Sequence, residues 1–284
     1  MRLLKYFLLL ILFYGCTKDK YKAPDAFFVK PQTIAVATTT LQGSTSHNIT
    51  DIWYYINGQF KGAYPVGNIM PFPVSGNNTL SFFAGIKNNG ISATRQPYEF
   101  YQPIIIDTTV EAGVTVNRNF TFKYKDACVF HWIESFEGYG TTTGITIQNS
   151  INTDTTYQIL NKASNPTADV FEGAKCLYIA LDNDHQIGQY QSTALFTLPK
   201  GGAPVYLEMN YKCNQPFDVG VYNGSSFTYV SSVNSSDGEW KKIYIQLSAG
   251  ATINLAATAG WFMKAVKQTD TPQIYIDNIK IISY

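Results

Sequence analysis

Histidines and paired carboxylates are common catalytic groups, and this chain holds few of them in a useful spacing. The three histidines, His47, His131 and His185, stand far apart, and none belongs to a His-Glu-x-x-His zinc motif. Glu134 and Glu137 are three residues apart on an expected strand, which separates them by about 10 Å and points them to opposite faces. A glycosidase needs two carboxyl groups on one substrate, so this pair does not suit acid–base catalysis. The sequence therefore predicts a protein that is not an enzyme.

Cysteine acylation is the second chemistry that the sequence suggests. Arg2 and Lys5 precede an unbroken apolar stretch, residues 7–13, of signal-peptide length and too short to span a bilayer. The pair Gly15-Cys16 resembles the end of a bacterial lipobox, although the two residues before it depart from that pattern. We expect residues 1–15 to be a lipoprotein signal peptide and Cys16 to carry the lipid that anchors the chain to a membrane. An ordinary secretory leader is the alternative.

The remaining cysteines and the charge balance exclude two other classes of function. Cys128, Cys176 and Cys213 lack the close spacing of a zinc site, and we expect them to be small buried side chains. A single disulfide among them remains open. The 21 basic and 20 acidic residues nearly cancel, so nothing indicates a nucleic-acid partner.

Aromatic side chains are the best candidates for binding, because outward-facing rings stack on sugars or anchor a protein partner. In the run Trp53-Tyr54-Tyr55, strand alternation sends one set inward and the other outward. We expect Trp53 to lie in the core and Tyr54 to be exposed. A proline-bounded segment downstream adds further candidates. The predicted partner-binding residues are Tyr54, Arg95, Tyr98, Phe100 and Tyr101.

Two β-rich domains must position these residues. Residues 16–31 are polar and aperiodic, which predicts a tether. From residue 32 to residue 126, short strands alternate with turn residues. The clearest hairpin has strands at residues 52–56 and 59–64 around Asn57-Gly58, a pair suited to positive φ angles. A set of strands of this size predicts an immunoglobulin-like β-sandwich.

Residues 127–284 predict a second all-β domain. The expected strands are residues 129–136, 175–181, 191–198, 205–213, 217–223, 227–233, 240–247 and 273–282. About eight strands over this length are typical of a jelly roll. In this domain we expect Trp240 to be buried and Trp261 to lie at the rim.

Two stretches resemble known families. The Ile-Thr-Asp-hydrophobic-Trp motif at residues 49–53, the Asn57-Gly58 hairpin and the segment from Gly85 to Arg95 are similar to a family of Bacteroidota outer-membrane lipoproteins. The opening of the second domain and its strands at residues 173–179, 239–247 and 274–281 resemble those of galactose-binding-like jelly rolls. The first resemblance implies a lipid-anchored protein of the outer membrane, with the cell surface favoured and the periplasmic face left open.

The jelly-roll resemblance also implies a structural calcium ion. In such modules an acidic residue near the start of the domain and another in its last strand often share the ion, and Glu137 and Asp277 occupy these places. Calcium prefers several hard oxygen ligands, which carboxylates and backbone carbonyls supply. We expect no other cofactor.

Two functions follow from these observations. In the first, which the sequence slightly favours, the protein is a structural or accessory subunit of an outer-membrane complex that assembles or exports envelope proteins, docked to a barrel or another lipoprotein. In the second, it is a surface glycan-binding lipoprotein, with the jelly roll as the carbohydrate-binding module. Exposed aromatics clustered on the jelly roll would favour the second function.

Overall fold

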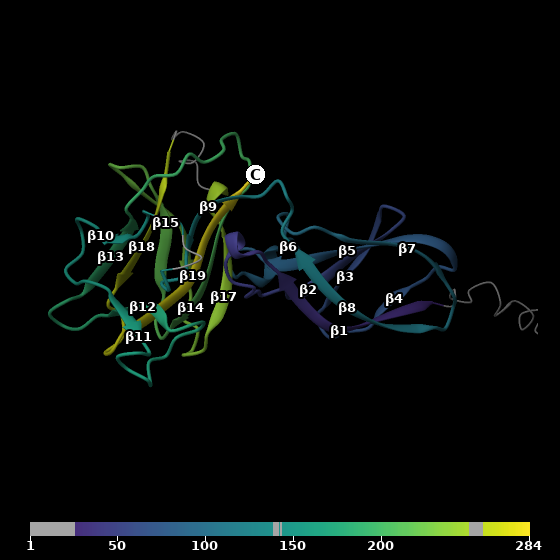
Figure 1. Ribbon diagram of the computed structural model, residues 1–284, viewed down its shortest axis with the longest axis horizontal. Coiled ribbons are helices and arrows are strands. Elements are labelled where there is room, and N and C mark those ends of the chain that lie inside the picture. Colours follow the sequence, from purple (N-terminus) through teal and green to yellow (C-terminus); the bar gives the residue numbers. More distant parts are fainter. Residues whose placement is uncertain (1–25, 139–141, 143, 250–257) are drawn as a thin grey trace, which may run out of the picture.

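The computed structural model describes residues 26–138, 142, 144–249 and 258–284 of the 284-residue chain. It is all-β, with an immunoglobulin-like sandwich followed by a jelly-roll sandwich, so the predicted fold class is confirmed (Figure 1). The signal peptide and Cys16 lie outside the described residues. Within the described residues, no helix has the length and apolar character needed to cross a membrane.

From residue 26 onward, the described part of the first sandwich has eight strands and two short 3-10 helices. They are β1 (Phe27–Ala37), η2 (Thr40–Gln42), β2 (Asp51–Ile56), β3 (Gln59–Pro65), β4 (Met70–Phe72), β5 (Gly76–Lys87), η3 (Ser92–Thr94), β6 (Arg95–Pro97), β7 (Ile104–Val110) and β8 (Thr115–Lys123). One sheet has the order β4-β1-β8. In the other, the order is β3-β2-β5, and β6 and β7 pair with different parts of β5.

Local sequence explains the start of this sandwich well, with one correction. The predicted hairpin joins β2 to β3, and its turn residues Asn57 and Gly58 have φ angles of 49° and 78°. The prediction that the tether extends to residue 31 is wrong, because β1 begins at Phe27. Phe27 and Val29 alternate with more exposed residues and are buried in the core, which gives this stretch the period of a strand.

The described residues of the second sandwich form eleven strands. They are β9 (Val129–Glu134), β10 (Ile147–Asn149), β11 (Gln158–Asn161), β12 (Lys175–Ala180), β13 (Ile187–Ser192), β14 (Val205–Cys213), β15 (Phe217–Tyr222), β16 (Phe227–Val233), β17 (Lys241–Gln246), β18 (Gly260–Val266) and β19 (Gln273–Ser283), with the 3-10 helix η4 (Leu247–Ala249). A five-stranded sheet has the order β10-β13-β18-β15-β16. A six-stranded sheet has the order β11-β12-β19-β14-β17, with β9 also paired to β19.

The core of the jelly roll lies between these two sheets. Trp132 and Trp261 are both fully buried there, with ring centroids 5.7 Å apart. The prediction that Trp261 lies at the rim is therefore wrong: it points inward from β18, a strand that the sequence analysis did not predict. Cys176 and Cys213 are buried as expected, Cys128 is half-buried, and all three are free thiols. Burial raises the pKa of Cys176 to about 12.

The two sandwiches pack directly against each other. The six-stranded sheet turns its outer face toward the first sandwich, and the five-stranded sheet lies on the far side (Figure 1). Tyr206 and Tyr244, on β14 and β17, belong to the buried core of the first sandwich. The backbone also continues across the boundary, since the Asn89 N–H donates to the Tyr244 carbonyl at 2.8 Å. One outer face of the jelly roll is thus covered, and the other is open.

Candidate functional site

The structure buries most of the predicted partner-binding residues. Tyr98, Phe100 and Tyr101 are 2%, 0% and 2% exposed, because the outer face of the six-stranded sheet covers them. The Tyr98 ring lies 5.3 Å from Tyr206 and 4.8 Å from Tyr244. The prediction that this segment is exposed for an external partner is therefore wrong, since the second domain of the same chain occupies it.

The remaining two predicted residues differ from each other. Tyr54 is 3% exposed and donates to the Pro71 carbonyl, so the prediction that it is exposed is wrong. Strand alternation separated the inward and outward sets correctly, but the outward set contains Trp53 and Tyr55. Arg95 is exposed as expected and lies 3.8 Å from Asp51, and its role in partner binding stays a prediction.

A buried carboxylate organises the junction between the domains. Glu208 is fully buried and accepts hydrogen bonds from the Tyr98 hydroxyl at 2.7 Å and from the Tyr124 hydroxyl at 2.9 Å. Lys242 pairs with it at 2.8 Å. Although burial favours the neutral acid, the charges of Lys242 and Lys280 hold the pKa of Glu208 below its usual value. Burial and the Glu208 charge raise the pKa of Tyr98 and Tyr124.

Lys280 is the second buried charge at this junction. Its ammonium donates to the Ser44 carbonyl at 2.7 Å and contacts the Tyr124 hydroxyl at 3.3 Å. Burial first, and then the positive charge of Lys242, lowers the pKa of Lys280 to about 7. These groups form a buried structural network at the junction of the two domains.

The two predicted calcium ligands lie near each other, but their carboxylates already have partners. Glu137 Oε1 accepts the backbone N–H groups of Ala174 and Lys175, each at 2.7 Å, and Asp277 accepts those of Glu172 and Asn278. Burial, with the charges of Glu172 and Glu137, raises the pKa of Asp277 to about 7.

Within the part of the chain that the structure describes, no three His, Cys, Asp or Glu side chains are grouped to hold a metal ion. Calcium binding at Glu137 and Asp277 stays a prediction. A calcium titration followed by thermal unfolding tests it. A rise in Tm that is lost in Asp277→Asn would support the site, and an unchanged Tm would reject it.

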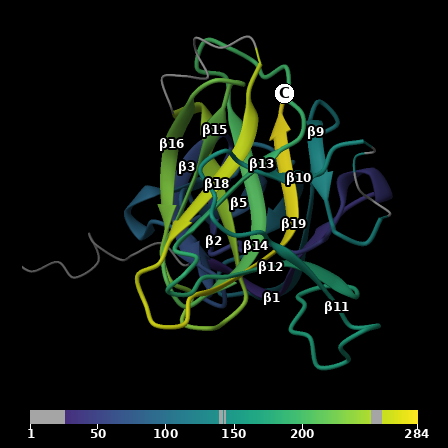
Figure 2. The same ribbon diagram turned by 90° about the vertical axis from the view of Figure 1, so that its left-hand side faces the viewer.

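The open face of the five-stranded sheet carries an aromatic cluster. Figure 2 looks toward this sheet, whose strands lie at the end of the molecule away from the first sandwich. Phe262 on β18 lies at the centre, with the Phe227 ring at 5.0 Å and the Tyr229 ring at 5.2 Å. Tyr222 stacks on Phe227 at 5.4 Å. Phe262 is fully buried beneath its neighbours, whereas Tyr229 is 51% exposed and offers its ring to solvent.

A glycine explains how Phe262 lies so close to the sheet. Gly220 on β15 is paired directly with Phe262, and a Cβ atom at this position would lie 2.5 Å from the Phe262 ring and 2.0 Å from the Thr228 carbonyl oxygen. No side chain other than hydrogen fits there, so the ring covers the bare backbone. The Phe262 ring thus forms the floor on which Phe227 and Tyr229 rest.

Polar side chains form the adjacent row of the same face. Strand pairing places Gln189, Lys264, Asp218 and Ser232 side by side across β13, β18, β15 and β16. The next row along the strands is Gln191, Phe262, Gly220 and Tyr229. Gln189 is held by a hydrogen bond from its amide nitrogen to Ser150 at 2.9 Å. Gln189 is only 1% exposed, so the partly exposed ammonium of Lys264 and carboxylate of Asp218 are the charged groups that stand beside the rings.

We define the open jelly-roll face as these two rows together with Tyr222 and Phe227. Its chemistry suits recognition of a molecule that has both an apolar surface and hydrogen-bonding edges, because the rings offer apolar contact and the polar row offers donors and acceptors. Asp218 is the one carboxylate in the two rows, so the face lacks the carboxyl pair that glycoside hydrolysis requires.

The sequence analysis missed this face because it missed two of its strands. β13 has the sequence IGQYQS and β18 has the sequence GWFMKAV, and neither shows a simple apolar–polar alternation. In both strands the outward residues are themselves largely buried, so the period-two pattern is lost. The strand expected at residues 191–198 ends at Ser192. The aromatic residues of β15 and β16 lie in strands that the sequence predicted. The strand β18, which carries Phe262 and Lys264, was not predicted.

Comparison with known proteins shows only distant likeness. No family model and no curated protein matches the chain. A solved structure of TmCBM61 in complex with β-1,4-galactotriose has 12% identity and a TM-score of 0.34, and the match covers 50% of this chain and 90% of that chain. A cleaved adhesin domain of Lys-gingipain from Porphyromonas gingivalis has 15% identity, a TM-score of 0.35 and coverage of 56% and 100%. The CBM22-1 xylan-binding domain from Paenibacillus barcinonensis has 15% identity, a TM-score of 0.33 and coverage of 55% and 96%.

Proposed function

We propose that this protein is a non-catalytic glycan-binding protein and that the open jelly-roll face binds the glycan. The observation that supports this most strongly is the partly exposed Tyr229 ring, held on Phe262 directly beside the partly exposed Asp218 and Lys264. A sugar ring has one apolar face and several hydroxyl groups at its edge. Tyr229 suits the apolar face, and the polar row suits the hydroxyl groups.

The accessory-subunit function keeps less support. Its predicted docking surface consisted mainly of aromatic residues that are buried between the two domains, where they contact Tyr206 and Tyr244. A partner protein would have to separate the domains and break the contacts of Glu208 to reach them. The glycan-binding function requires no such change, because its aromatic cluster lies on the open side of the jelly roll.

The proposal includes a lipid anchor at Cys16 that holds the protein at the outer membrane, with the binding domains on the cell surface. It rests on the apolar leader and the cysteine that follows it. Metabolic labelling of cells with an alkyne-bearing fatty acid tests the anchor. Label on the wild type and not on Cys16→Ser is the expected result, and label on neither protein would refute acylation. Protease digestion of intact cells then tests surface exposure.

Affinity gel electrophoresis tests the binding function directly. The mature protein is run in gels that contain a neutral β-glucan, a galactomannan, a xylan or a pectic galactan, and slower migration than in an empty gel reports binding. We expect at least one of these gels to retard the wild type. Tyr229→Ala and Asp218→Ala should each weaken the retardation. For Tyr229→Ala, which removes the aromatic ring, the apparent affinity should fall by about tenfold.

Tyr178→Ala is the matched control, because Tyr178 is a partly exposed tyrosine of the six-stranded sheet and lies on the other side of the jelly roll. It should bind as the wild type does. Circular dichroism melts establish that each variant is folded. Equal retardation of the wild type and the Tyr229 and Asp218 variants would reject the open jelly-roll face as the binding site.

A further inference from the structure

The first sandwich carries a second aromatic cluster, on the outer side of the sheet formed by β3, β2, β5 and β7. The Phe60 ring lies 5.2 Å from Trp53 and 5.4 Å from Tyr55, and Tyr55 lies 5.0 Å from Phe83. Phe60 is 51% exposed, and the other three rings are partly exposed. None of these four rings belongs to the core of the sandwich. The core is formed by the alternate residues of the same strands, which point to the opposite side of the sheet.

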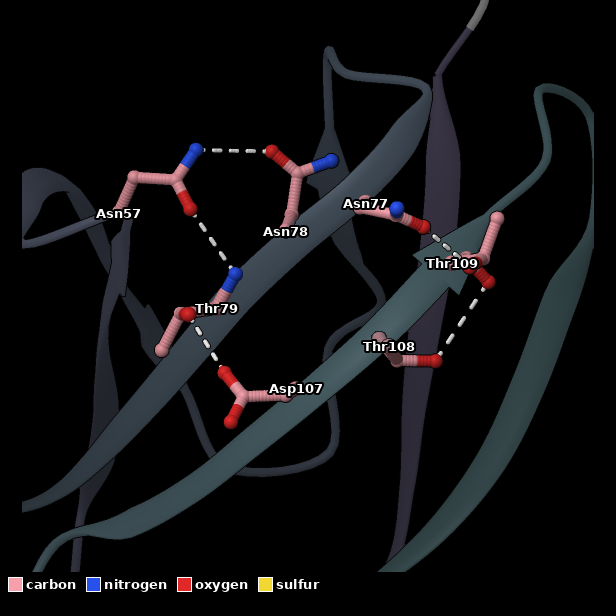
Figure 3. Close-up of a pocket in the computed structure, with 7 residues that line it drawn as sticks. All are labelled: Asn57, Asn77, Asn78, Thr79, Asp107, Thr108 and Thr109. Atoms are coloured by element: carbon pink, nitrogen blue, oxygen red, sulfur yellow. Dashed lines mark hydrogen bonds between the residues drawn. The ribbon is translucent and has the colours of Figure 1, made fainter.

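A polar hollow of about 670 Å³ adjoins this cluster. Figure 3 shows its lining, which consists of amide, hydroxyl and carboxylate side chains. Thr79 donates to Asp107 Oδ1, and Thr109 donates to the Asn77 amide oxygen, each at 2.5 Å. The other Asp107 oxygen and the Asn77 amide nitrogen have no hydrogen-bond partner among the described residues. The hollow therefore keeps both acceptor and donor capacity for a ligand.

Strand register places the hollow directly beside the rings. Tyr55 pairs with Ser81 on β5, and Ser81 pairs with Ile105 on β7. Two residues further along the same strands, Thr79 pairs with Asp107. Because alternate strand residues share a face, the rings and the hollow form one continuous strip, which extends about 13 Å along β5 from Phe83 to Thr79.

We propose that this strip, from Trp53 to Asp107, is a second binding surface and that its ligand is a neutral saccharide chain. The four aromatic rings of the strip suit the apolar faces of sugar rings, and the polar hollow suits their hydroxyl groups. The open jelly-roll face combines the same two kinds of contact. A protein partner would need an apolar pocket for its anchor residue, and this hollow is polar throughout. Asp107 is the one charged group that lines the hollow, and it disfavours an acidic saccharide.

The two surfaces lie in different domains, so one molecule would hold two glycan segments. The inference does not depend on the jelly-roll site, because every contact that supports it lies within the first sandwich. If both sites bind, a single chain bridges two points on a polysaccharide, and its apparent affinity exceeds that of either site alone.

Affinity electrophoresis of site-specific variants tests the inference. The probes are neutral β-glucan, galactomannan and xylan, with alginate as the acidic contrast. The first variant, Tyr229→Ala with Asp218→Ala, disables the jelly-roll face. The second, Tyr55→Ala with Phe60→Ala, disables the strip, and the third carries all four substitutions. We expect a neutral polysaccharide still to retard the first variant measurably. The apparent affinity of the third variant should be lower by a further factor of about ten.

Asp107→Asn serves as a milder variant that keeps the size of the side chain and its hydrogen bond with Thr79. It should retain the fold and reduce the preference for neutral over acidic polysaccharide. Circular dichroism melts are recorded for every variant, so that a loss of binding is not confused with unfolding.

Several outcomes would overturn the second site. One is that the first variant loses all retardation while the second behaves as the wild type, which leaves only the jelly-roll site. A second is retardation by alginate alone, and a third is the absence of retardation in every neutral gel. A concentration-dependent dimer in the wild type that disappears in Phe60→Ala would show that the strip contacts another copy of the chain. Conversely, if only the second variant loses retardation, the result would support the strip and reject the jelly-roll face.

Discussion

The two outer faces of the jelly roll carry similar types of residue and differ in what covers them. Both place tyrosine, lysine and carboxylate side chains on neighbouring strands. On the six-stranded sheet the first sandwich covers these residues, and Glu208 is enclosed by Tyr98, Tyr124 and Lys242. On the five-stranded sheet the corresponding cluster around Tyr229 faces solvent. Residue type alone therefore does not distinguish a binding face from an interface, and what covers each face decides between them.

The energetic consequences of the two environments differ as well. A buried charge must keep its partner, because water does not replace the lost interaction. A charge on an open face exchanges its partner for water at little cost to stability. Substitutions on the covered face should thus change the free energy of unfolding, and equivalent substitutions on the open face should change ligand binding.

The largest effect is expected for Glu208→Ala. It leaves Lys242 buried without a counter-charge and removes the acceptor of two tyrosine hydroxyls, so the free energy of unfolding should fall by roughly 3–5 kcal/mol. Urea denaturation monitored by circular dichroism measures this. Asp218→Ala on the open face is the matched control and should stay within about 0.5 kcal/mol of the wild type. Equal losses in both variants would contradict the distinction between the two faces.

The next effect concerns pH. The folded pKa of Lys280 is lowered to about 7, below its usual value of 10.5. Between these two values the unfolded chain retains a proton that the folded chain has released, so this group makes stability rise with pH, by up to about 1.4 kcal/mol per pH unit. Lys280→Met cannot titrate and should lack this contribution.

The measurement is the difference in the free energy of unfolding between wild type and Lys280→Met at pH 7.0, 7.75 and 8.5. Other groups that titrate in this range, such as the free cysteines, are common to both proteins and cancel in the difference. We expect the free energy of unfolding of the wild type to rise relative to that of the variant as pH increases. Parallel profiles would show that Lys280 keeps an ordinary pKa at the junction.

A smaller effect is expected for Tyr98→Phe. The ring and its contacts with Tyr206 and Tyr244 remain, and only the hydroxyl that donates to Glu208 is lost. Hydrogen bonds to charged groups contribute about 1.5–3 kcal/mol, and Tyr124 and Lys242 still hold the carboxylate, so a loss near the lower value follows. Thermal and urea unfolding measure it, with Tyr178→Phe as the control. A neutral result would show that Tyr98 acts through its ring alone.

The smallest effect on stability is expected for Tyr229→Ala, which should change the free energy of unfolding by roughly 1 kcal/mol or less, because half of the side chain is already in water. Its effect on glycan retardation should nevertheless be clear. A large loss of stability in this variant would place Tyr229 among the structural residues and weaken the contrast between the two faces.

The sequence predicts the features of this fold that local chemistry determines. The Asn57-Gly58 turn specifies its hairpin because positive φ angles are needed at both positions, and strand alternation separates Tyr54 from Trp53 and Tyr55. Alternation does not say which set faces the core, and the outward set was assigned wrongly. The prediction that Tyr98 is exposed failed for a different reason. The residues that bury it, such as Glu208, lie more than 100 positions away in the sequence.

The candidate site was only partly visible in the sequence. Tyr222, Phe227 and Tyr229 lie in predicted strands, but Phe262 and Lys264 lie in β18 and Gln189 lies in β13. These two strands run through the middle of the five-stranded sheet, where neighbours on both sides bury their outward residues. A strand whose outward residues are largely buried shows no regular apolar–polar alternation, and its pairing partners become known only from the fold.

The parallel pairing of β1 with β8 has a mechanical consequence. The chain enters the first sandwich at the start of β1 and leaves it toward the jelly roll at the end of β8, and because the strands are parallel these two points lie at opposite ends of the ladder. Tension applied along the chain between them pulls the two strands in opposite directions along their length. The ladder hydrogen bonds are then loaded together in shear, and they do not open one after another. A protein held at its N-terminus and pulled through its second domain would resist such a load with the whole ladder.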